Sequence, residues 1–228
     1  MPDATTVWLF RKALTDGGLI EEMFSTFNRF LDENGYEAKG GQIIDATIIP
    51  VPVQHNSRAE NQQVKKGAVP PTWKEAPHKL SQKDTDARWT KKNNESYFGY
   101  KNHVNIDAEY GFIHNHRVTD ASVHDSRQFC EVLDGANEGD KIWAASAYRS
   151  PALEEVLAEV GYESEINERG YRNHPLTEAQ KESNRGKSKI RSKVEHIFGT
   201  YVTNMGETGS VYWDRAGSRE FGVEGFNL

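Results

Sequence analysis

Cysteine is almost absent from this sequence, because Cys130 is the only one in 228 residues. That scarcity excludes an internal disulfide framework and a thiolate metal cluster. Runs of eighteen apolar residues are also missing, so the sequence predicts no membrane span. The first residues, MPDATTVWLFRKAL, carry an early acid and no apolar core, which is not the pattern of a secretory signal peptide. These absences together predict a cytoplasmic protein.

A strong positive charge is lacking as well, since the formal net charge is −6. This total argues weakly against a nucleic-acid-binding protein, but the distribution of charge is more informative than the sum. Residues 65–92 contain eight Lys or Arg against three acids, and residues 181–193 contain six against Glu182 alone. Each run is either a solvated surface or a surface for an anionic partner. The second leads directly into Glu195, which makes it the more informative of the two.

Periodicity divides the chain into three parts. Residues 1–39 predict two helices, the first capped by Asp3 or Thr5 and the second with an apolar stripe typical of core packing. Residues 40–203 predict alternating strands and helices, interrupted at 54–95 by a polar, basic segment without periodicity, which we interpret as an inserted loop. Residues 204–228 are rich in glycine and acids and predict an irregular tail.

Asp45 is the first candidate site residue, because it lies in the middle of a β-branched strand over residues 40–50. A carboxylate among apolar neighbours is costly to bury unless it is paired or binds a metal ion. The alternative is an edge strand on which Asp45 faces solvent. A second short strand, 140–145, ends at Ala145, where an acidic or polar residue is expected if chemistry begins there.

The order of predicted elements in 40–203 is three strands, a helix, a strand, a helix, a strand and a helix of roughly 184–202. This order is typical of the ribonuclease-H-like fold, an α/β fold with a mixed five-stranded sheet flanked by helices. In that fold the first and fourth strands are neighbours and the last helix crosses them. Asp45, position 145 and Glu195 are then expected to converge. Converging oxygen ligands suit Mg²⁺, or Mn²⁺ as its substitute, better than zinc.

Five motifs make the resemblance to a known family explicit. They are Ile44–Thr47, Phe98–Val104 with Asp107, Val118–Ala121 with His124-Asp125, Trp143–Ser150, and Arg191–Phe198. In this order and spacing the sequence, over about residues 3–200, resembles the DDE transposases of bacterial insertion sequences, in particular the group named after insertion sequence 5. The resemblance implies a metal-dependent enzyme that nicks double-stranded DNA at the ends of the element and joins the freed 3′-hydroxyl to target DNA.

The resemblance also implies roles for particular residues. Asp45 and Glu195 are its first and third catalytic acids and the expected metal ligands, and Ala145 stands where the family places its second acid. Residues expected to contact DNA are Tyr148 and Arg149 beside that position, Arg191 and Lys193 beside Glu195, and Lys101 and Arg88 near the cleft. Because the family pairs two DNA ends, a homodimer is a further expectation, and no membrane association is expected.

The departures from the family pattern suggest impaired chemistry. An alanine has no oxygen ligand, and Ser146 is a poor substitute for a carboxylate, so cleavage and joining are expected to be severely impaired or absent. The family usually has more helical sequence before the segment that begins here, and residues 206–228 resemble nothing in it. A frameshifted or truncated relic explains both ends. The alternatives are a non-catalytic transposase remnant that binds DNA or a partner, and a metal-dependent nuclease acting on other nucleic acids.

Two other sets of residues have competing interpretations. The spacing of His103, His114, His116, His124 and His196 fits no common structural zinc site, so a zinc site is not favoured. His103 shares one face of a predicted strand with Lys101, where it either lines the cleft or has a packing or turn role. Trp73 and Trp89 in the basic segment are able to stack on an extruded base. Anchoring that segment to the core is the alternative that we favour.

Overall fold

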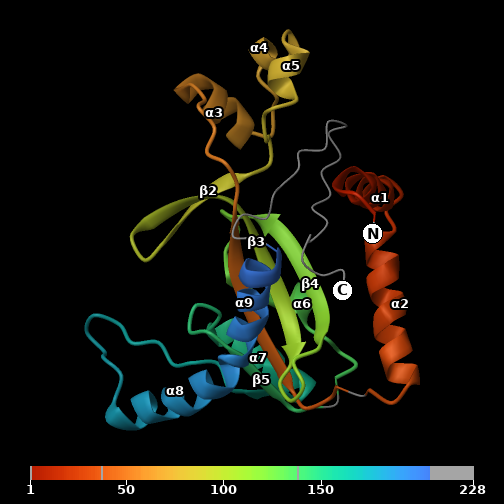
Figure 1. The fold of residues 1–228 in the computed structure, drawn as a ribbon. Coiled ribbons are helices and arrows are strands. Elements are labelled where there is room, and N and C mark those ends of the chain that lie inside the picture. Colours follow the sequence, from red (N-terminus) through yellow and green to blue (C-terminus); the bar gives the residue numbers. More distant parts are fainter. Residues whose placement is uncertain (1, 37, 138, 206–228) are drawn as a thin grey trace.

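The computed structural model describes residues 2–36, 38–137 and 139–205, and within these residues six strands form one sheet (Figure 1). The strands are β1 (Gln42–Pro50), β2 (Arg88–Lys92), β3 (Glu95–Asp107), β4 (Ile113–Asp120), β5 (Lys141–Ala144) and β6 (Glu163–Ser164). The helices are α1 (Ala4–Asp16), α2 (Ile20–Glu33), α3 (Arg58–Lys65), α4 (Pro71–Lys74), α5 (Pro77–Leu80), η1 (Asp125–Arg127), α6 (Phe129–Val132), α7 (Pro151–Val160), α8 (Glu178–Arg191) and α9 (Lys193–Met205).

Strand β1 lies inside the sheet, between β3 and β5. It pairs antiparallel with β3 along its whole length and parallel with β5 over Gln42–Ile44. Beyond β5 the parallel strand β6 follows, while β4 and β2 both pair with β3 on the side away from β1. The predicted mixed sheet and the pairing of the first strand with the strand after the first helix are confirmed. The predicted number of five strands is wrong, because β2 forms within the segment interpreted as a loop.

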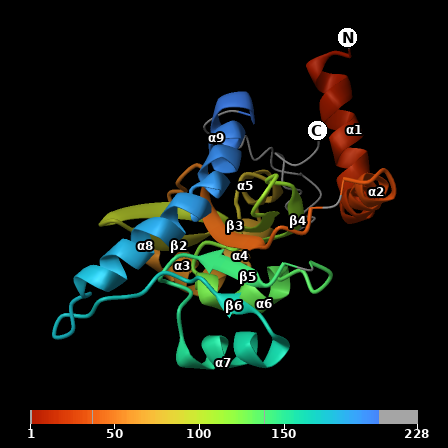
Figure 2. The ribbon, with the colours of Figure 1, turned by 90° about the horizontal axis from the view of Figure 1, so that it is seen from below.

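Helices cover both faces of the sheet, with α8 and α9 on one side and α6 and α7 on the other (Figure 2). Successive side chains of a strand point to opposite faces. Ile43 therefore packs with Val194 and Phe198 of α9, whereas Ile44 packs with the cluster formed by α6 and α7. Burying a side chain of this size contributes about 1.5–3 kcal/mol. The next residue, Asp45, is consequently directed to the same face as Ile43, toward α8 and α9.

The basic segment 54–95 is largely folded, so the prediction that it is a loop without regular structure is wrong. It contains α3, α4, α5 and β2, and α3 begins with a capping box between Ser57 and Glu60. Trp73 is completely buried and its indole N–H donates to Glu60 Oε1 at 2.6 Å. Helices of four residues are too short to produce a visible period. Contacts such as the one between Trp73 and Glu60, rather than periodicity, hold this segment together.

The two N-terminal helices form as predicted, but their apolar stripe is not core. Asp3 caps α1 by accepting a hydrogen bond from Thr6 N–H at 2.7 Å. No residue of α2 is buried, and Phe30 is 56% exposed. Helix α2 contacts β4 through a T-shaped pair between the rings of Phe24 and His116, with 4.8 Å between their centroids. Amphipathic spacing predicts an apolar face without identifying what covers it, so the prediction of core packing is wrong here.

The predicted final helix is two helices, α8 and α9, that meet at Ser192. The Ser192 hydroxyl donates to the carbonyl of Lys189 at 2.8 Å, a local bond that competes with the regular helical pattern. Of the predicted irregular tail, residues 204 and 205 end α9, and 206–228 lie outside the described residues. Within the described residues, no helix has the length and apolar character required to cross a bilayer.

Candidate active site

Asp45 occupies the middle of β1, and its side chain is 14% exposed. The strand is internal, so the alternative of an edge strand with a solvent-facing carboxylate does not apply. One carboxylate oxygen, Oδ1, accepts a hydrogen bond from the Ala46 N–H at 2.8 Å. The other, Oδ2, accepts a hydrogen bond from Arg191 Nη1. The charge of Asp45 is therefore mostly removed from water and compensated by a cation on α8.

Arg191 joins Asp45 to Glu195. The same Nη1 that binds Asp45 lies 3.7 Å from Glu195 Oε1, one helical turn further along the chain. Glu195 is 60% exposed, whereas the Arg191 side chain is 22% exposed. The two acids predicted to converge are thus brought to one guanidinium group, Asp45 from the buried side and Glu195 from the solvent side.

Ala145 follows directly after the last paired residue of β5. Ala144 lies opposite Ile44 in the parallel register, so position 145 comes at the level of Asp45 on the neighbouring strand. The methyl group of Ala145 packs against the core cluster that contains Tyr148. The Tyr148 N–H donates to the Ala145 carbonyl at 3.0 Å, forming the tight turn that leads into α7.

Tyr148 is completely enclosed beside this turn, with 1% of its surface exposed. Burial, followed by the negative charges of Asp45 and Asp125, raises the pKa of the Tyr148 phenol well above its ordinary value. Within the described part of the chain, neither the Tyr148 hydroxyl nor Arg191 Nε has a hydrogen-bond partner. Buried polar groups normally have partners, so each of these two atoms is able to form a further hydrogen bond.

The ionisation of Asp45 is opposed by its environment. Burial raises the pKa of the Asp45 carboxyl, while the Arg191 charge and the Ala46 N–H act in the opposite direction and Glu195 adds to the increase. The net result is a raised pKa. Removing a carboxylate from water disfavours its charged form, and a single guanidinium does not fully offset that effect here.

The oxygen donors of the site determine whether it is able to bind a divalent metal ion. Among the described residues, no group of three or more His, Cys, Asp or Glu side chains is arranged to hold a metal ion. Asp45 and Glu195 supply carboxylates, but Arg191 lies between them and Ala145 supplies no oxygen. In this arrangement the residues do not form a complete site for a hard cation, which favours six or more oxygen ligands.

The remaining predicted DNA contacts are placed in different parts of the molecule. Lys193 Nζ donates to the Ala108 carbonyl at 2.5 Å and so holds α9 to the β3–β4 turn. Arg88 donates to the carbonyls of Thr85, Ala87 and Val64, which ties β2 to α3. Both side chains therefore have structural partners in the absence of DNA.

Lys101 and His103 point to the sheet face opposite Asp45, because Val104 is the β3 residue that pairs with Asp45. Lys101 Nζ lies 2.8 Å from Asp125 Oδ1. His103 is fully buried, and its Nε2 is 3.0 Å from the Thr119 hydroxyl. Burial lowers the pKa of His103 to about 4. The structure therefore places Lys101 and His103 away from the carboxylates of Asp45 and Glu195. The charges of Asp45 on one face and of Asp125 on the other both raise the pKa of the Tyr148 phenol.

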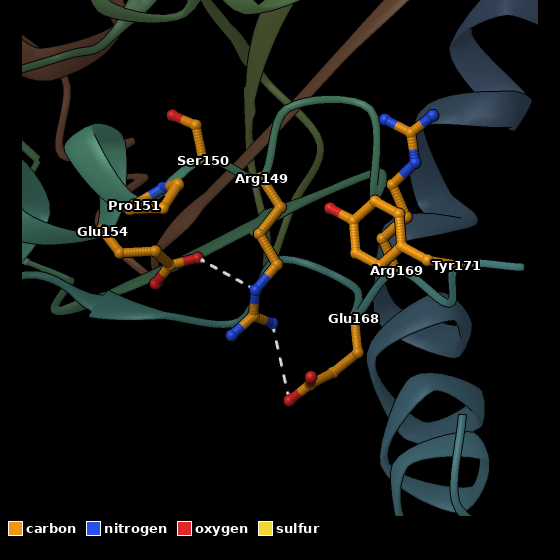
Figure 3. Close-up of a pocket in the computed structure, with 7 residues that line it drawn as sticks. All are labelled: Arg149, Ser150, Pro151, Glu154, Glu168, Arg169 and Tyr171. Carbon is orange, nitrogen blue, oxygen red and sulfur yellow. Dashed lines mark ion pairs between the residues drawn. The ribbon is translucent and has the colours of Figure 1, made fainter. Parts of the chain in front are cut away.

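Arg149 lines a cavity of about 350 Å³ that the sequence did not predict (Figure 3). Its guanidinium pairs with Glu154 of α7 at 3.6 Å and with Glu168 at 3.5 Å. Arg169 and Tyr171, from the loop between β6 and α8, complete the opposite wall. That loop has no periodicity and no motif, so no sequence signal identified its residues.

Comparison with known proteins identifies the family to which the chain belongs. Residues 37–208 match the family described as the transposase DDE domain. Over 197 residues the chain is 32% identical to the transposase for insertion sequence element IS1106 of Neisseria meningitidis serogroup B, an alignment that includes 84% of this chain. The chain spans 64% of the length of that relative. No solved structure matches it significantly. With a strand-borne Asp45 and a helix-borne Glu195 sharing one cation, the chain belongs to the transposase DDE domain family.

Proposed function

We propose that this chain is the catalytic domain of an insertion-sequence transposase of the insertion sequence 5 group, with a ribonuclease-H-like fold and double-stranded DNA as its partner. The observation that carries the proposal is the meeting of Asp45 and Glu195 at Arg191, beside the end of β5. A central strand and a crossing helix are rigid supports, as a phosphoryl-transfer site requires. The proposed reaction is cleavage at the element ends followed by strand transfer to target DNA.

Mg²⁺, or Mn²⁺ in its place, is the ion that we propose for the intact form of this site. The family generally uses divalent metal ions, and Asp45 and Glu195 are the two carboxylates of this chain that would contribute to holding one. Alanine at 145 removes the third oxygen donor, so we propose that cleavage and joining are severely impaired in this chain. The orphaned hydroxyl of Tyr148 and Nε of Arg191 support this view, since both lack the acceptor that a carboxylate at 145 offers.

The proposed path of DNA follows the basic side of α8. Lys181, Arg185 and Lys189 of this helix are exposed, and they precede Arg191 on the same element. A row of cations leading to a carboxylate site suits a phosphate backbone, because phosphate contacts supply most of the affinity and little of the sequence preference. A homodimer that pairs two element ends is part of the same proposal.

The alternative function is a remnant that binds DNA or a partner without catalysis. The observation that favours it is the position of Arg191, whose guanidinium already pairs with both carboxylates. A metal-dependent nuclease without preference for element ends is the other rival. Both rivals differ from the first proposal in measurable ways.

Calorimetric titration with Mn²⁺ is the first test, on the natural chain, on Ala145→Asp and on Ala145→Asp combined with Asp45→Asn. We expect tight binding by Ala145→Asp and weak binding by the other two, because only that variant combines carboxylates at 45, 145 and 195. Equal, weak binding by all three proteins would contradict the convergence of these positions on one metal site.

Strand transfer by the same variants distinguishes the functions. The substrate is duplex DNA taken from both flanks of the gene that encodes this chain. Activity of Ala145→Asp that depends on those flanks supports the transposase. Duplex binding without activity in either form supports the remnant, and cleavage of flank and scrambled DNA at equal rates supports the nuclease.

A further inference from the structure

The cavity beside Arg149 lies between the start of α7 and the loop that leads to α8. We call it the Arg149 pocket; it is lined by Arg149, Ser150, Pro151, Glu154, Glu168, Arg169 and Tyr171 (Figure 3). Its volume of about 350 Å³ lies at the lower end of the range for ligand pockets, about 300–1,000 Å³. One small group fits such a space, whereas a duplex does not.

The loop that forms one wall is fixed to α8 by side-chain hydrogen bonds. The Asn184 side chain accepts from the Glu168 N–H at 2.7 Å and donates to the Glu168 carbonyl at 3.0 Å. Asn167 Nδ2 donates to the Ser188 hydroxyl at 2.9 Å. Tyr171 closes a tight turn with His174 through two backbone hydrogen bonds of 2.9 and 3.0 Å. The wall is therefore held in place before any ligand binds.

The floor of the pocket carries balanced charge. Arg149 pairs with Glu154 and Glu168, and its Nη1 also donates to the Ile166 carbonyl at 3.2 Å. With Arg169 included, the lining holds two arginines and two glutamates, so the formal charges cancel. A multiply charged anion gains little in such a space. A neutral planar group whose edge contains both donors and acceptors matches it better.

The rim offers a flat, exposed platform. The Arg169 guanidinium carbon lies 5.8 Å from the centre of the Tyr171 ring, and Tyr171 is 63% exposed. In the part of the chain that the structure describes, Arg169 makes no ion pair. Aromatic rings and guanidinium planes are the surfaces on which unstacked bases of single strands stack. A cation at the same rim also suits the phosphate next to such a base.

The pocket adjoins the candidate active site through two shared elements. Arg149 directly follows Tyr148, whose phenol is influenced by Asp45, and the wall loop is bonded to α8, which carries Arg191. A strand held in the pocket therefore passes close to the turn at 145–148.

We propose that the Arg149 pocket binds one unstacked base of single-stranded DNA, with Tyr171 as the stacking surface and Arg169 on the adjacent phosphate. This inference rests on the proposed function, because it assigns a subsite to the DNA on which that function acts. The polar floor contacts the edge of the base. Glutamate oxygens accept from an exocyclic amino group, and arginine donates to a ring nitrogen or carbonyl.

The test uses fluorescence anisotropy with the full chain and a labelled hexanucleotide that contains 2-aminopurine at its centre. We expect Tyr171→Ala to weaken binding about five- to a hundredfold, the range for loss of one base–aromatic contact. Arg169→Ala is expected to weaken binding as well, because it removes the contact to the adjacent phosphate. The matched controls are Tyr110→Ala, which removes a tyrosine of the same 63% exposure on the β3–β4 turn, and Arg29→Ala on α2. Both are expected to bind like the natural chain.

The 2-aminopurine signal supplies a readout that a structural role does not change. Fluorescence quenched on binding to the natural chain and recovered in Tyr171→Ala supports base stacking in the pocket. Unchanged affinity in Tyr171→Ala overturns the proposal, as does failure of the natural chain to bind the hexanucleotide. The proposal is also overturned, in favour of a simple phosphate site, if millimolar inorganic phosphate displaces the hexanucleotide and only Arg169→Ala weakens its binding. Normal binding of flank duplex in those cases leaves the proposed function standing, whereas loss of all DNA binding refutes both.

Discussion

Arg191 contacts two carboxylates of very different exposure, which gives a prediction with a built-in comparison. The Asp45 side chain is 14% exposed and the Glu195 side chain 60% exposed, while Arg191 itself is 22% exposed. Removing one member of a mostly buried ion pair leaves an uncompensated charge, whereas an exposed pair one helical turn apart contributes about 0.3–0.5 kcal/mol. The two contacts of the same guanidinium should therefore differ strongly in energy.

We predict a coupling energy of about 2 kcal/mol between Asp45 and Arg191, against less than about 0.5 kcal/mol between Arg191 and Glu195. The magnitude follows from a pair that is mostly, but not completely, withdrawn from water. Arg191→Met retains the aliphatic part of the side chain, and Asp45→Asn and Glu195→Gln retain shape without charge. Each acid is combined with Arg191→Met in a double-mutant cycle.

The assay is equilibrium unfolding in urea, followed by tryptophan fluorescence, with free energies extrapolated to zero denaturant. Arg191→Met alone is expected to lower the free energy of unfolding by about 3 kcal/mol, most of it because Asp45 stays charged and unpaired. Adding Asp45→Asn should recover most of that loss. Adding Glu195→Gln should recover almost none.

The pH dependence gives an independent check on the same contact. Burial raises the pKa of Asp45 and Arg191 opposes the increase, so Arg191→Met is expected to raise that pKa further. A carboxyl with a raised folded-state pKa binds its proton more readily when folded, so the free energy of unfolding increases as the pH falls through that value. The cost of Arg191→Met should therefore be smaller at pH 5 than at pH 7. Equal coupling for the two acids, or a cost that does not change with pH, would refute this assignment of Arg191.

Two further predictions concern the support of the site. Burial lowers the pKa of His103 to about 4 from 6.5, so the unfolded chain binds a proton that the folded chain refuses between these values. The free energy of unfolding should therefore fall by about 3 kcal/mol as the pH drops from 6.5 to 4. The measurement is the urea midpoint at both pH values. His103→Gln should remove the part of the midpoint change that is due to this proton, whereas the control His78→Gln, at an exposed site, should not. Gly99→Ala places a methyl group directly against the Ile49 carbonyl oxygen and should cost about 3 kcal/mol or more, whereas Gly186→Ala, which meets open space on α8, should stabilise by about 0.5–1 kcal/mol. Thermal unfolding of both glycine variants checks this, and equal melting temperatures would contradict it.

The position of Asp45 could be predicted from sequence because local pattern and burial agree there. Ile43 and Ile44 flank it in a β-branched run, and the strand proves to be internal. The spacing of Arg191 and Glu195 likewise predicted neighbours on one helical face, and the two side chains meet at 3.7 Å. The contact between Arg191 and Asp45 was not predictable, because it joins residues 146 positions apart and depends on how α8 crosses the sheet.

The basic segment and the Arg149 pocket show where sequence patterns fail. The helices α4 and α5 have four residues each, so their stability depends on contacts such as the one from Trp73 to Glu60, and no periodicity records it. The wall of the pocket depends in the same way on Asn167 and Asn184, whose side chains bind α8. Single polar residues in an irregular loop give no indication of their partners. Such features follow from tertiary structure alone.

The proposed loss of a carboxylate at 145 also accounts for two buried polar groups that lack hydrogen-bond partners among the described residues near the site. A buried hydroxyl or guanidinium N–H without a partner costs about 1–3 kcal/mol, so the orphaned Tyr148 hydroxyl and Arg191 Nε are expensive features of an alanine-containing site. A carboxylate at 145 supplies acceptors for such donors and adds a negative charge beside Asp45. That charge competes with Asp45 for the Arg191 guanidinium and so weakens the ion pair between Arg191 and Asp45. It also makes the binding of a cation between the acids more favourable. Restoring Asp at 145 should therefore change the partners of Arg191 as well as the number of oxygen ligands, and Mn²⁺ binding by Ala145→Asp reports both effects together.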